Sequence, residues 1–336
     1  MTSAERGQQA AQRILAGQAA AIARAITWVE NGASEASTLL TALAPHLGKA
    51  HRIGVTGPPG AGKSTLVDGL AREARKAGET VGIVAVDPSS PFTGGALLGD
   101  RVRMAISLED PDVFVRSMAN RGCLGGLARA VQEAADILDA AGKQRVFLET
   151  VGVGQSELAV AQSCDTCVVV MVPEAGGVVQ AMKAGLMEIA EIFVVNKSDR
   201  PAADEMQRQL IEAASLIKHG DRRPPVVKTA AVTGEGVSEL YREILKHRAW
   251  LQEGDRLERK RLQQNQARIR DLVRVALEDK LWTDDLIANQ LIDSAELVRT
   301  GQIGLQQATG QVWRVVLERL GQATPDSVPS LRGVNQ

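Results

Sequence analysis

The sequence has few aromatic residues and few cysteines. Aromatic residues make up 3% of its 336 residues, so a core has to be built mainly from Val, Leu, Ile and Ala, as in a parallel sheet covered by helices. Three cysteines are too few, and odd in number, for a disulfide framework. We therefore expect a reducing, cytoplasmic setting.

The sequence also lacks long apolar runs and a large charge of one sign. No apolar run reaches the roughly 18 residues that a transmembrane helix needs. The stretch 1–12 has no apolar segment of the kind found in a signal peptide. A net charge of −1 gives no general attraction to nucleic acid or to an anionic membrane, so neither is expected as a partner.

Short apolar runs alternate with segments of helical periodicity. Most runs are continuous rather than alternating, which is typical of strands buried on both faces of a parallel sheet. The runs are 53–56, 81–86, 113–116, 146–150, 167–172, 192–195 and 226–229, with helical segments at 66–76, 126–140 and 202–218. The pattern predicts an α/β fold with a mostly parallel, doubly wound sheet, in which ligands bind beyond the carboxyl ends of the strands.

The regions before and after this pattern are predicted to be helical. The expected domains are a helical N-terminal extension (1–48), a central domain (49–250), a helical C-terminal arm (251–322) and a flexible tail (323–336). The expected helices of the flanks are 4–28, 34–47, 255–274, 282–289 and 306–320. Basic residues of the arm such as Lys260 and Arg261 are interpreted as a solvated helix face with interleaved acidic residues, rather than as a nucleic-acid site.

A glycine-rich turn follows the first apolar run and closes on Lys63 and Ser64. The pattern is that of the phosphate-binding loop of nucleoside triphosphatases, in which glycines let main-chain N–H groups surround the phosphates at a helix N-terminus. Lys63 is expected to contact the β- and γ-phosphates, and the Ser64 hydroxyl to bind Mg²⁺. The nucleotide-binding residues predicted here are Gly57, Pro58, Pro59, Gly60, Ala61, Gly62, Lys63, Ser64 and Thr65.

A second motif, Asn196-Lys197-Ser198-Asp199, follows the run at 192–195. An aspartate at this place can accept two hydrogen bonds from the N1–H and amino groups of guanine, whereas adenine offers no donor at either position. The motif therefore predicts that GTP is preferred over ATP, with Asn196, Lys197 and Asp199 in the site. As an alternative, Asp199 would only cap the helix that follows it.

The loop after the last apolar run is expected to complete the base site. Backbone N–H groups of Ala230, Ala231 and Val232 are placed to meet the O6 atom of guanine. No side-chain role is expected from these three residues.

Carboxylates at the ends of strands beside the phosphate loop suggest a metal site. Asp87, Asp100 and Glu149 are predicted to hold Mg²⁺ together with Ser64, because hard oxygen ligands suit this ion. The N–H group of Gly152 is expected to sense the γ-phosphate. Lys63, Asp100, Glu149 and Gly152 form the predicted catalytic set.

The residue after Gly152 carries a further expectation. Many small GTPases have a glutamine at this position, where it orients the attacking water, but this chain has Val153. We therefore expect slow intrinsic hydrolysis that a partner protein accelerates.

Cys164 and Cys167 have the spacing of half a zinc site or of a redox pair. The chain has no second such pair, and Cys167 begins an apolar run. Both cysteines are therefore interpreted as small core residues.

Five segments make the chain resemble the methylmalonyl-CoA mutase-associated GTPases, also called the MeaB/ArgK family. They are GPPGAGKST (57–65), VDPSSPFTGGALLGDRVRM (86–104), ETVGVGQSE (149–157), NKSD (196–199) and GEG (234–236). The second string is the most diagnostic, because it is long and uncommon among GTPases. Relatives often carry Ser-Ala-Arg where this chain has Ala230-Ala231-Val232, which weakens any side-chain role there but leaves backbone contacts intact.

The resemblance implies a function and partners. It implies a P-loop GTPase chaperone that gates delivery of adenosylcobalamin to a B12-dependent acyl-CoA mutase and protects that enzyme, with the vitamin held by the mutase. It also implies a homodimer formed through the C-terminal arm. A switch loop that responds to the mutase is implied at Glu174, Gly176, Gly177, Gln180 and Lys183.

Three other functions are left open by the motifs, of which a purely structural interaction module would show no nucleotide-dependent change in its affinity for a partner. Another is a metallochaperone GTPase that inserts nickel, although the chain has no His- or Cys-rich loading segment. The third is a kinase that uses ATP, which the guanine motif disfavours.

Overall fold

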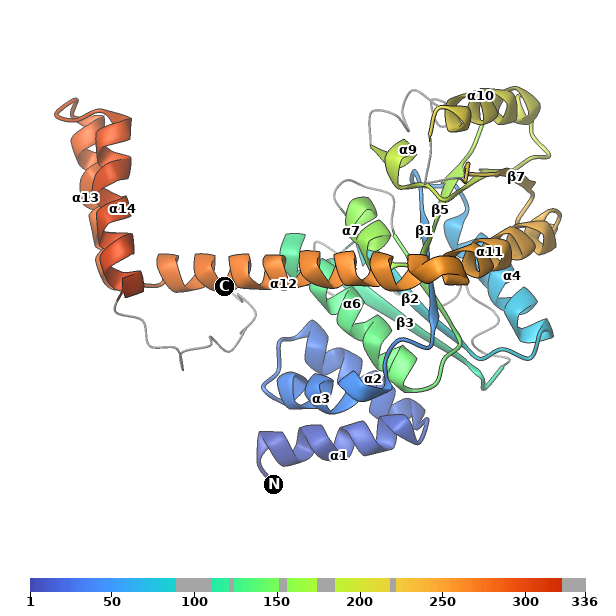
Figure 1. Ribbon diagram of the computed structural model, residues 1–336, viewed down its shortest axis with the longest axis horizontal. Helices are drawn as coiled ribbons and strands as arrows, with labels where there is room; N and C mark the ends of the chain where they lie inside the picture. Colours follow the sequence, from blue (N-terminus) through green and yellow to red (C-terminus); the bar gives the residue numbers. More distant parts are fainter. Residues whose placement is uncertain (89–109, 121–123, 151–155, 174–184, 218–221, 322–336) are drawn as a thin grey trace. The chain divides into compact units, whose positions relative to one another are not determined.

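The computed structural model describes residues 1–88, 110–120, 124–150, 156–173, 185–217 and 222–321 (Figure 1). The chain splits into two compact units, Met1–Gln264 and Asn265–Gln336. The first unit holds both the sheet and the N-terminal helices, and the finer division at residues 48 and 250 stays a prediction. Within the described ranges, no helix combines the length and the apolar character needed to cross a bilayer.

In the described part of the first unit, seven strands form one sheet in the order β3-β2-β4-β1-β5-β6-β7. Every neighbouring pair is parallel. The strands are β1 (His51–Thr56), β2 (Val81–Pro88), β3 (Val113–Asn120), β4 (Arg145–Glu149), β5 (Thr166–Met171), β6 (Ile192–Asn196) and β7 (Val226–Thr229). Each predicted apolar run coincides with one of them, so the doubly wound parallel sheet is confirmed.

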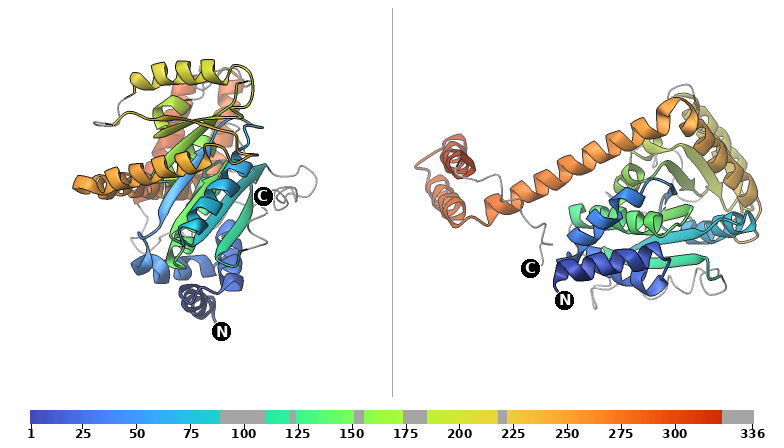
Figure 2. Two further views of the ribbon diagram at one scale, coloured as in Figure 1. Left: turned by 90° about the vertical axis from the view of Figure 1, so that its right-hand side faces the viewer. Right: turned by 60° about the horizontal axis from the view of Figure 1, so that its bottom comes forward.

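Helices cover both faces of the sheet (Figures 1 and 2). One face packs on α4 (Lys63–Lys76) and α11 (Val237–Gln252). The other packs on α6 (Leu124–Ala140), α7 (Ser156–Ser163) and α10 (Ala203–Ser215), with the short α9 (Leu186–Ile189) beside them. Because both faces are covered, the central strands β4 and β5 are buried at every residue, and β1 is buried at every residue except Arg52.

The N-terminal extension packs against α6 as a third layer. It contains α1 (Ser3–Leu15), α2 (Ala19–Glu30) and α3 (Glu35–Leu43), followed by the 3₁₀ turn η1 (Ala44–His46). The expected single helix over 4–28 is therefore wrong. Gly17 has φ +73°, a left-handed conformation that ends α1 and lets α2 turn back.

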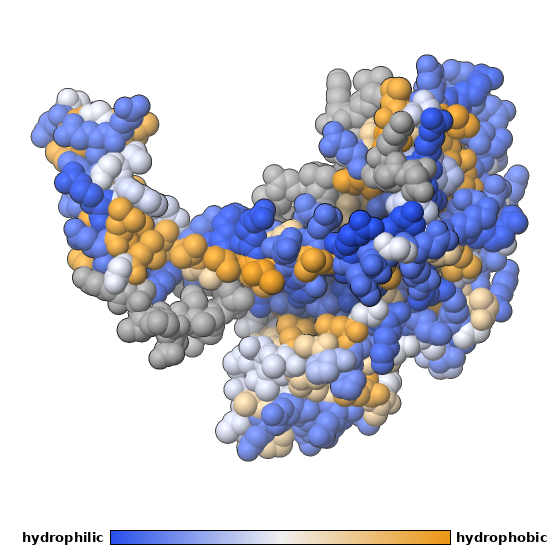
Figure 3. Space-filling view, viewed as in Figure 1, coloured by the Kyte–Doolittle hydropathy of each residue, from blue (hydrophilic) through white to orange (hydrophobic). Residues whose placement is uncertain are grey.

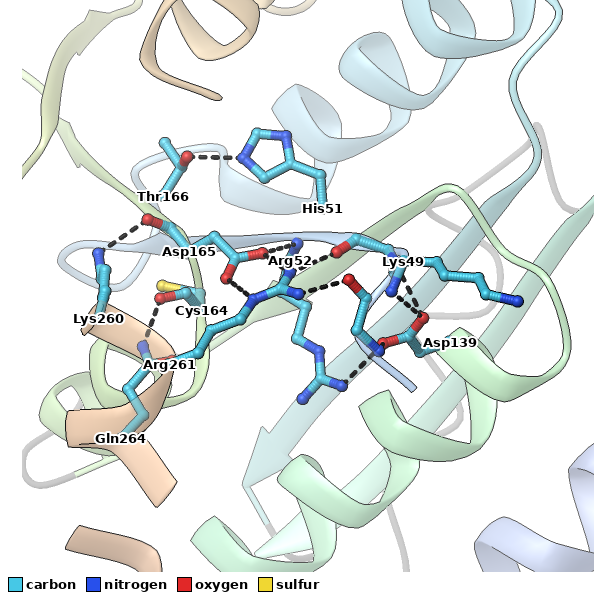
Figure 4. Close-up of polar contacts among 12 residues, drawn as sticks. Lys49, His51, Arg52, Asp139, Cys164, Asp165, Thr166, Lys260, Arg261 and Gln264 are labelled. Atoms are coloured by element: carbon cyan, nitrogen blue, oxygen red, sulfur yellow. Dashed lines mark hydrogen bonds and ion pairs between the residues drawn. The ribbon is translucent and has the colours of Figure 1, made fainter. Parts of the chain in front are cut away.

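The start of the C-terminal arm is fastened to the amino edge of the sheet, where the strands begin (Figure 4). After α11 and the 3₁₀ turn η2 (Glu253–Asp255), α12 (Arg256–Trp282) begins. Arg261 pairs with Asp165 at 2.8 Å, and Gln264 donates to the carbonyl of Cys164 at 2.8 Å. Lys260 pairs with Glu191. The interpretation of Lys260 and Arg261 as solvated is therefore wrong, because their partners come from the sheet domain rather than from neighbours on α12.

Asp139 and Arg261 together hold the linker between η1 and β1 (Figure 4). The carboxylate of Asp139 accepts the N–H groups of Gly48, Lys49 and Ala50 at 2.8, 3.1 and 2.9 Å. Arg261 donates to the carbonyls of Gly48 and Ala50 at 2.5 and 2.8 Å. The N-terminal extension and the first turns of α12 are thus tied to one short stretch of chain.

The second unit contains the later part of α12, α13 (Asp285–Arg299) and α14 (Leu305–Gly321). The expected helix over 282–289 is present with different bounds, because α12 ends at Trp282 and Asp284 caps the start of α13 with its side chain. α13 packs against α14 around Ile287, Ala308 and Val316. Orange patches lie along the arm in Figure 3. The large hydrophobic side chains exposed on these helices are Ile269, Val273, Trp282, Leu286, Ile292, Leu305, Trp313 and Leu317.

Candidate functional site

The predicted site loops lie together at the carboxyl edge of the sheet. β1 lies in the middle of the sheet between β4 and β5, and the phosphate loop connects its last residue to α4. β4 ends at Glu149, and β6 ends at Asn196. In a doubly wound sheet this edge, where crossovers diverge on either side of a strand, is the place for a ligand.

The phosphate loop needs glycine at two positions for steric reasons. Gly57 has φ +142°, and a Cβ atom there would lie 2.1 Å from the carbonyl oxygen of Val170 in β5. Gly62 has φ +82°, and a Cβ atom there would lie 2.5 Å from Nδ2 of Asn196. The loop therefore passes so close to β5 and to the motif after β6 that a side chain does not fit.

Lys63 is the first residue of α4 and is buried. Its ammonium group donates to the carbonyl oxygens of Gly57 and Pro58, each at 2.9 Å. The loop thus curls around its own lysine. This arrangement places a positive charge inside a ring of main chain at a helix N-terminus, which suits the binding of phosphate.

Ser64 and Glu149 form the polar contact expected of a magnesium site. The Ser64 hydroxyl donates to Oε1 of Glu149 at 2.5 Å, and Glu149 is 6% exposed at the end of β4. A hydroxyl that gives its proton to a carboxylate keeps its oxygen lone pairs for a cation, and both oxygens are hard ligands. The two residues therefore fit Mg²⁺, although the described residues contain no group of three or more His, Cys, Asp or Glu side chains that would hold a metal by themselves.

Asn196 joins the phosphate loop to the loop after β7. Its Nδ2 donates to the carbonyl of Ala61 at 2.7 Å, and its Oδ1 accepts from the Thr229 hydroxyl at 3.0 Å and the Ala231 N–H at 3.1 Å. The side chain is buried, so water does not compete for these bonds. One amide thereby sets the spacing between the expected phosphate and base subsites.

Asp199 is exposed and does not cap the following helix. The N-cap of α10 is Ala202, with φ +70° and no side-chain hydrogen bond, so the alternative interpretation of Asp199 as a helix cap is wrong. Lys197 has φ +56°, and Ser198 donates its N–H to the carbonyl of Thr229 at 3.0 Å. This turn presents the Asp199 carboxylate to solvent at the edge where the base is expected.

The loop after β7 only partly matches the expectation of three available backbone donors. The N–H of Ala230 donates to the carbonyl of Glu235 at 3.0 Å, and the N–H of Ala231 donates to Asn196. Val232 is 91% exposed, and its N–H makes no hydrogen bond within the described part of the chain. Of the three residues, Val232 is therefore the one whose backbone N–H can donate to a ligand.

A contact that the sequence analysis missed lies at the same edge. The hydroxyl of Thr150, just after Glu149, donates to the hydroxyl of Thr56 at 3.1 Å, and both residues are buried. The two residues are 94 positions apart, so no local pattern in the sequence indicates that they meet.

Several predicted residues lie outside the described part of the structure and stay predictions. They are Asp100, Gly152, Val153, Glu174, Gly176, Gly177, Gln180 and Lys183, together with the side chain of Asp87, whose backbone lies near the end of β2.

Cys164 and Cys167 are both free and buried, as expected of small core residues. A hydrogen bond with Cys164 and burial raise the pKa of the Cys167 thiol well above its usual value. A thiol kept neutral in this way is a poor nucleophile and a poor metal ligand.

Comparison with known proteins finds one family over most of the chain. The family model described as methylmalonyl-CoA mutase-associated GTPase MeaB matches residues 22–285. A protein of Pyrococcus horikoshii named as a GTPase is 51% identical over 254 residues, which cover 74% of this chain and 80% of the relative. The mouse protein named methylmalonic aciduria type A homolog, mitochondrial, is 35% identical over 247 residues, covering 68% of this chain and 60% of that protein.

A solved structure shares the fold over nearly the whole chain. The crystal structure of a protein described as an LAO/AO transport system kinase superposes with a TM-score of 0.74 at 26% sequence identity, covering 92% of this chain and 97% of that one. The sheet, the phosphate loop and these matches together show that the chain belongs to the family of methylmalonyl-CoA mutase-associated P-loop GTPases.

Proposed function

We propose that the chain is a GTP-dependent chaperone that gates delivery of adenosylcobalamin to a B12-dependent acyl-CoA mutase and protects that enzyme from inactivation. The observation that carries the proposal is the match of the mutase-associated family model to residues 22–285, a range that includes the whole nucleotide site described above. The name of the mouse relative, which refers to methylmalonic aciduria, supports the same assignment. In this proposal adenosylcobalamin stays on the mutase.

Each residue of the site has a role in binding and hydrolysing GTP in this proposal. Lys63 contacts the β- and γ-phosphates, while Ser64 and Glu149 hold Mg²⁺ at the contact that they already share. Mg²⁺, when bound, neutralises charge that develops on the phosphates. Asp87 and Asp100 are proposed to complete the metal site, and the N–H of Gly152 to contact the γ-phosphate.

Selection of guanine depends on the second half of the site. The carboxylate of Asp199 accepts hydrogen bonds from the N1–H and amino groups of guanine, and the N–H of Val232 donates to O6. The exposure of both residues supports this assignment. An adenine base would leave the carboxylate without its donors, which a hydrogen-bonding site rejects strongly.

The partner completes the cycle in two ways. Because Val153 stands where a water-orienting glutamine is common, we propose that hydrolysis is slow until the mutase binds. The segment that contains Glu174, Gly176, Gly177, Gln180 and Lys183 is proposed to respond to the mutase.

We also propose that the arm pairs with the arm of a second copy. The large hydrophobic side chains exposed on α12, α13 and α14 support this, because a monomer rarely leaves such a surface uncovered. Sedimentation at several concentrations tests the dimer, and a monomer at all of them contradicts it.

The chaperone proposal is tested by mutase binding in two nucleotide states. Purified cobalamin-dependent methylmalonyl-CoA mutase is titrated onto the immobilised chain with GDP and with a non-hydrolysable GTP analogue. We expect the affinity of the two proteins to differ between the nucleotides, and GTP hydrolysis to accelerate on addition of mutase. Equal binding in both states with no acceleration contradicts the proposal.

Calorimetry with GDP and ADP tests the base assignment separately. We expect strong preference for GDP, and replacement Asp199→Asn to reduce that preference by about tenfold or more, since a lost charged hydrogen bond costs about 1.5–3 kcal/mol. The surface variant Asp204→Asn, in an exposed ion pair with Lys228, serves as the control. A preference for ADP favours the kinase alternative, and tight Ni²⁺ binding by the chain favours the metallochaperone alternative.

A further inference from the structure

The buried hydroxyl pair of Thr56 and Thr150 lies between the two parts of the site that handle phosphate and metal. Thr56 is the last residue of β1 and precedes Gly57, the first residue of the phosphate loop. Thr150 follows Glu149, the last residue of β4. Their hydroxyl oxygens are 3.1 Å apart, with Thr150 as donor, and the two residues are 0% and 1% exposed.

The pair is one of three hydrogen bonds that tie Glu149 and Thr150 to the segments flanking the phosphate loop, two of them to β1 and one to the start of α4. The N–H of Thr150 donates to the carbonyl of Val55 at 3.2 Å, which extends the β1–β4 ladder by one residue. The Ser64 hydroxyl donates to Glu149 at 2.5 Å. Thr56 precedes residues 57–63 of the loop and Ser64 follows them. Thr150 is therefore hydrogen-bonded at one end of the loop and Glu149 at the other.

We propose that Thr150 is a positioning residue for GTP hydrolysis. Its hydroxyl locks the backbone that carries Glu149 to the end of β1, so that the Glu149 carboxylate stays within reach of Ser64 and of the cation that the two residues hold. Thr150 touches neither nucleotide nor metal in this proposal; it acts through Glu149.

The contacts expected to bind the nucleotide do not involve the Thr150 hydroxyl. Main-chain contacts to the phosphates come from the loop itself, and the contacts of Lys63 go to Gly57 and Pro58. None of these involves Thr150. Loss of the Thr150 hydroxyl is therefore expected to spare nucleotide binding in the absence of metal and to affect the step that needs Glu149 in register.

The test uses the full chain with Thr150→Val, which keeps the shape of the side chain, and Thr150→Ser, which keeps the hydroxyl. We expect Thr150→Val to slow single-turnover GTP hydrolysis about fivefold, the effect of one neutral hydrogen bond lost at the transition state. The Mg²⁺ concentration for half-maximal rate should rise by a similar factor. Affinity for GDP in EDTA should stay within about twofold, and Thr150→Ser should restore the rate to within about twofold.

A matched control is Thr166→Val at the opposite edge of the sheet. Thr166 is also fully buried, and its hydroxyl contacts His51 at 2.7 Å and His247 at 2.8 Å. This variant should lower the melting temperature and leave the rate of hydrolysis unchanged. If Thr150→Val behaves in the same way, the proposal is overturned and Thr150 is structural.

Two further outcomes also decide the question. If Thr150→Val does not fold, the double variant Thr56→Val/Thr150→Val replaces the hydroxyl pair by an apolar pair of the same shape, and slow hydrolysis by that folded protein supports the proposal. If the rate, the affinity for GDP in EDTA and the melting temperature of Thr150→Val fall together, or if Thr150→Ser is as slow as Thr150→Val, the proposal fails.

Discussion

Charged side chains at the two edges of the sheet have different partners. At the amino edge, charged side chains of distant segments pair with one another: Arg261 with Asp165, and Arg52 with Asp139. At the carboxyl edge, Asp199 and Val232 are exposed, and the contacts of Lys63 and Asn196 go largely to main chain.

This difference suggests that the amino edge serves the stability of the fold, whereas the carboxyl edge serves the proposed ligand site. Buried charges are stable only when they are paired and hydrogen-bonded, and the amino edge meets that requirement from within the chain. Burial opposes the charged form of Asp165, but the hydrogen bonds and the charge of Arg261 outweigh it and hold the pKa of this carboxyl below its usual value. The carboxyl edge instead leaves Asp199 and Val232 exposed, as the proposed base site requires.

Replacement of Asp165 by Ala is the strongest way to break the amino edge. Asp165 accepts from the N–H of Arg52 and from two nitrogens of Arg261, all at 2.8–2.9 Å. Its removal leaves the buried side of Arg261 without a counter-charge, and we expect the free energy of unfolding to fall by about 3–5 kcal/mol. Urea unfolding measures this.

The control for that experiment is Asp204→Ala, which removes an exposed ion pair with Lys228 and should leave the urea midpoint unchanged. Nucleotide affinity of the folded fraction of Asp165→Ala should equal that of the unmodified chain. A loss of GDP affinity without a loss of stability would show that the two edges are not separate in function.

Replacement of Lys63 by Ala breaks the carboxyl edge instead. Its ammonium group is the point charge of the phosphate loop, so we expect the affinity for GTP to fall by about 100-fold or more, equivalent to about 2.7 kcal/mol. Calorimetry with GTP and Mg²⁺ measures this. Lys76→Ala, at the exposed end of the same helix, is the matched control. An unchanged affinity for GTP in Lys63→Ala would contradict the assignment of this loop to phosphate binding.

The pH dependence of stability sharpens the comparison with a smaller effect. Burial lowers the pKa of His51 at the amino edge to about 3. The unfolded chain therefore binds this proton more readily, and the stability that the neutral imidazole allows is present above the usual pKa of about 6.5 and is lost as the pH falls below it. Between pH 7.5 and pH 5.5 the loss should be about 1.4 kcal/mol.

Urea midpoints of the chain and of His51→Gln at the two pH values test this expectation. Glutamine keeps a donor for Thr166 but does not titrate, so the variant should lose less stability than the unmodified chain over this interval. Equal losses in both proteins would show that another group controls the acid sensitivity.

The nucleotide loops and the strands could be predicted because their chemistry is local. The residues from Gly57 to Ser64 are consecutive in the sequence, so the motif is visible without the fold. A continuous apolar run such as β5 likewise predicts a buried strand from its own residues alone. The N-terminal helices were harder, because the Ala-rich stretch 4–28 suits one long helix and only Gly17 marks the break.

The side-chain partners could not be predicted, because they join residues far apart in the chain. Asn196 was expected in the site, but its bond to Ala61 spans 135 positions, and the bond between Thr150 and Thr56 spans 94. The pairing of Arg261 with Asp165 converts a residue of an apparently solvated helix face into part of a buried cluster.

The sequence by itself determined that a phosphate loop, an Asn-Lys-Ser-Asp motif and a series of buried strand segments occur in this chain, because each is recognised from residues next to one another. Only the tertiary structure decided which polar groups bond to one another and which stay exposed. Asp139 and Asp165 form hydrogen bonds and ion pairs within the chain at the amino edge, while Asp199 is exposed at the carboxyl edge. The physical reason is that the free energy of a charged or polar group is set by its surroundings after folding, and those surroundings come from segments that the local sequence does not contain.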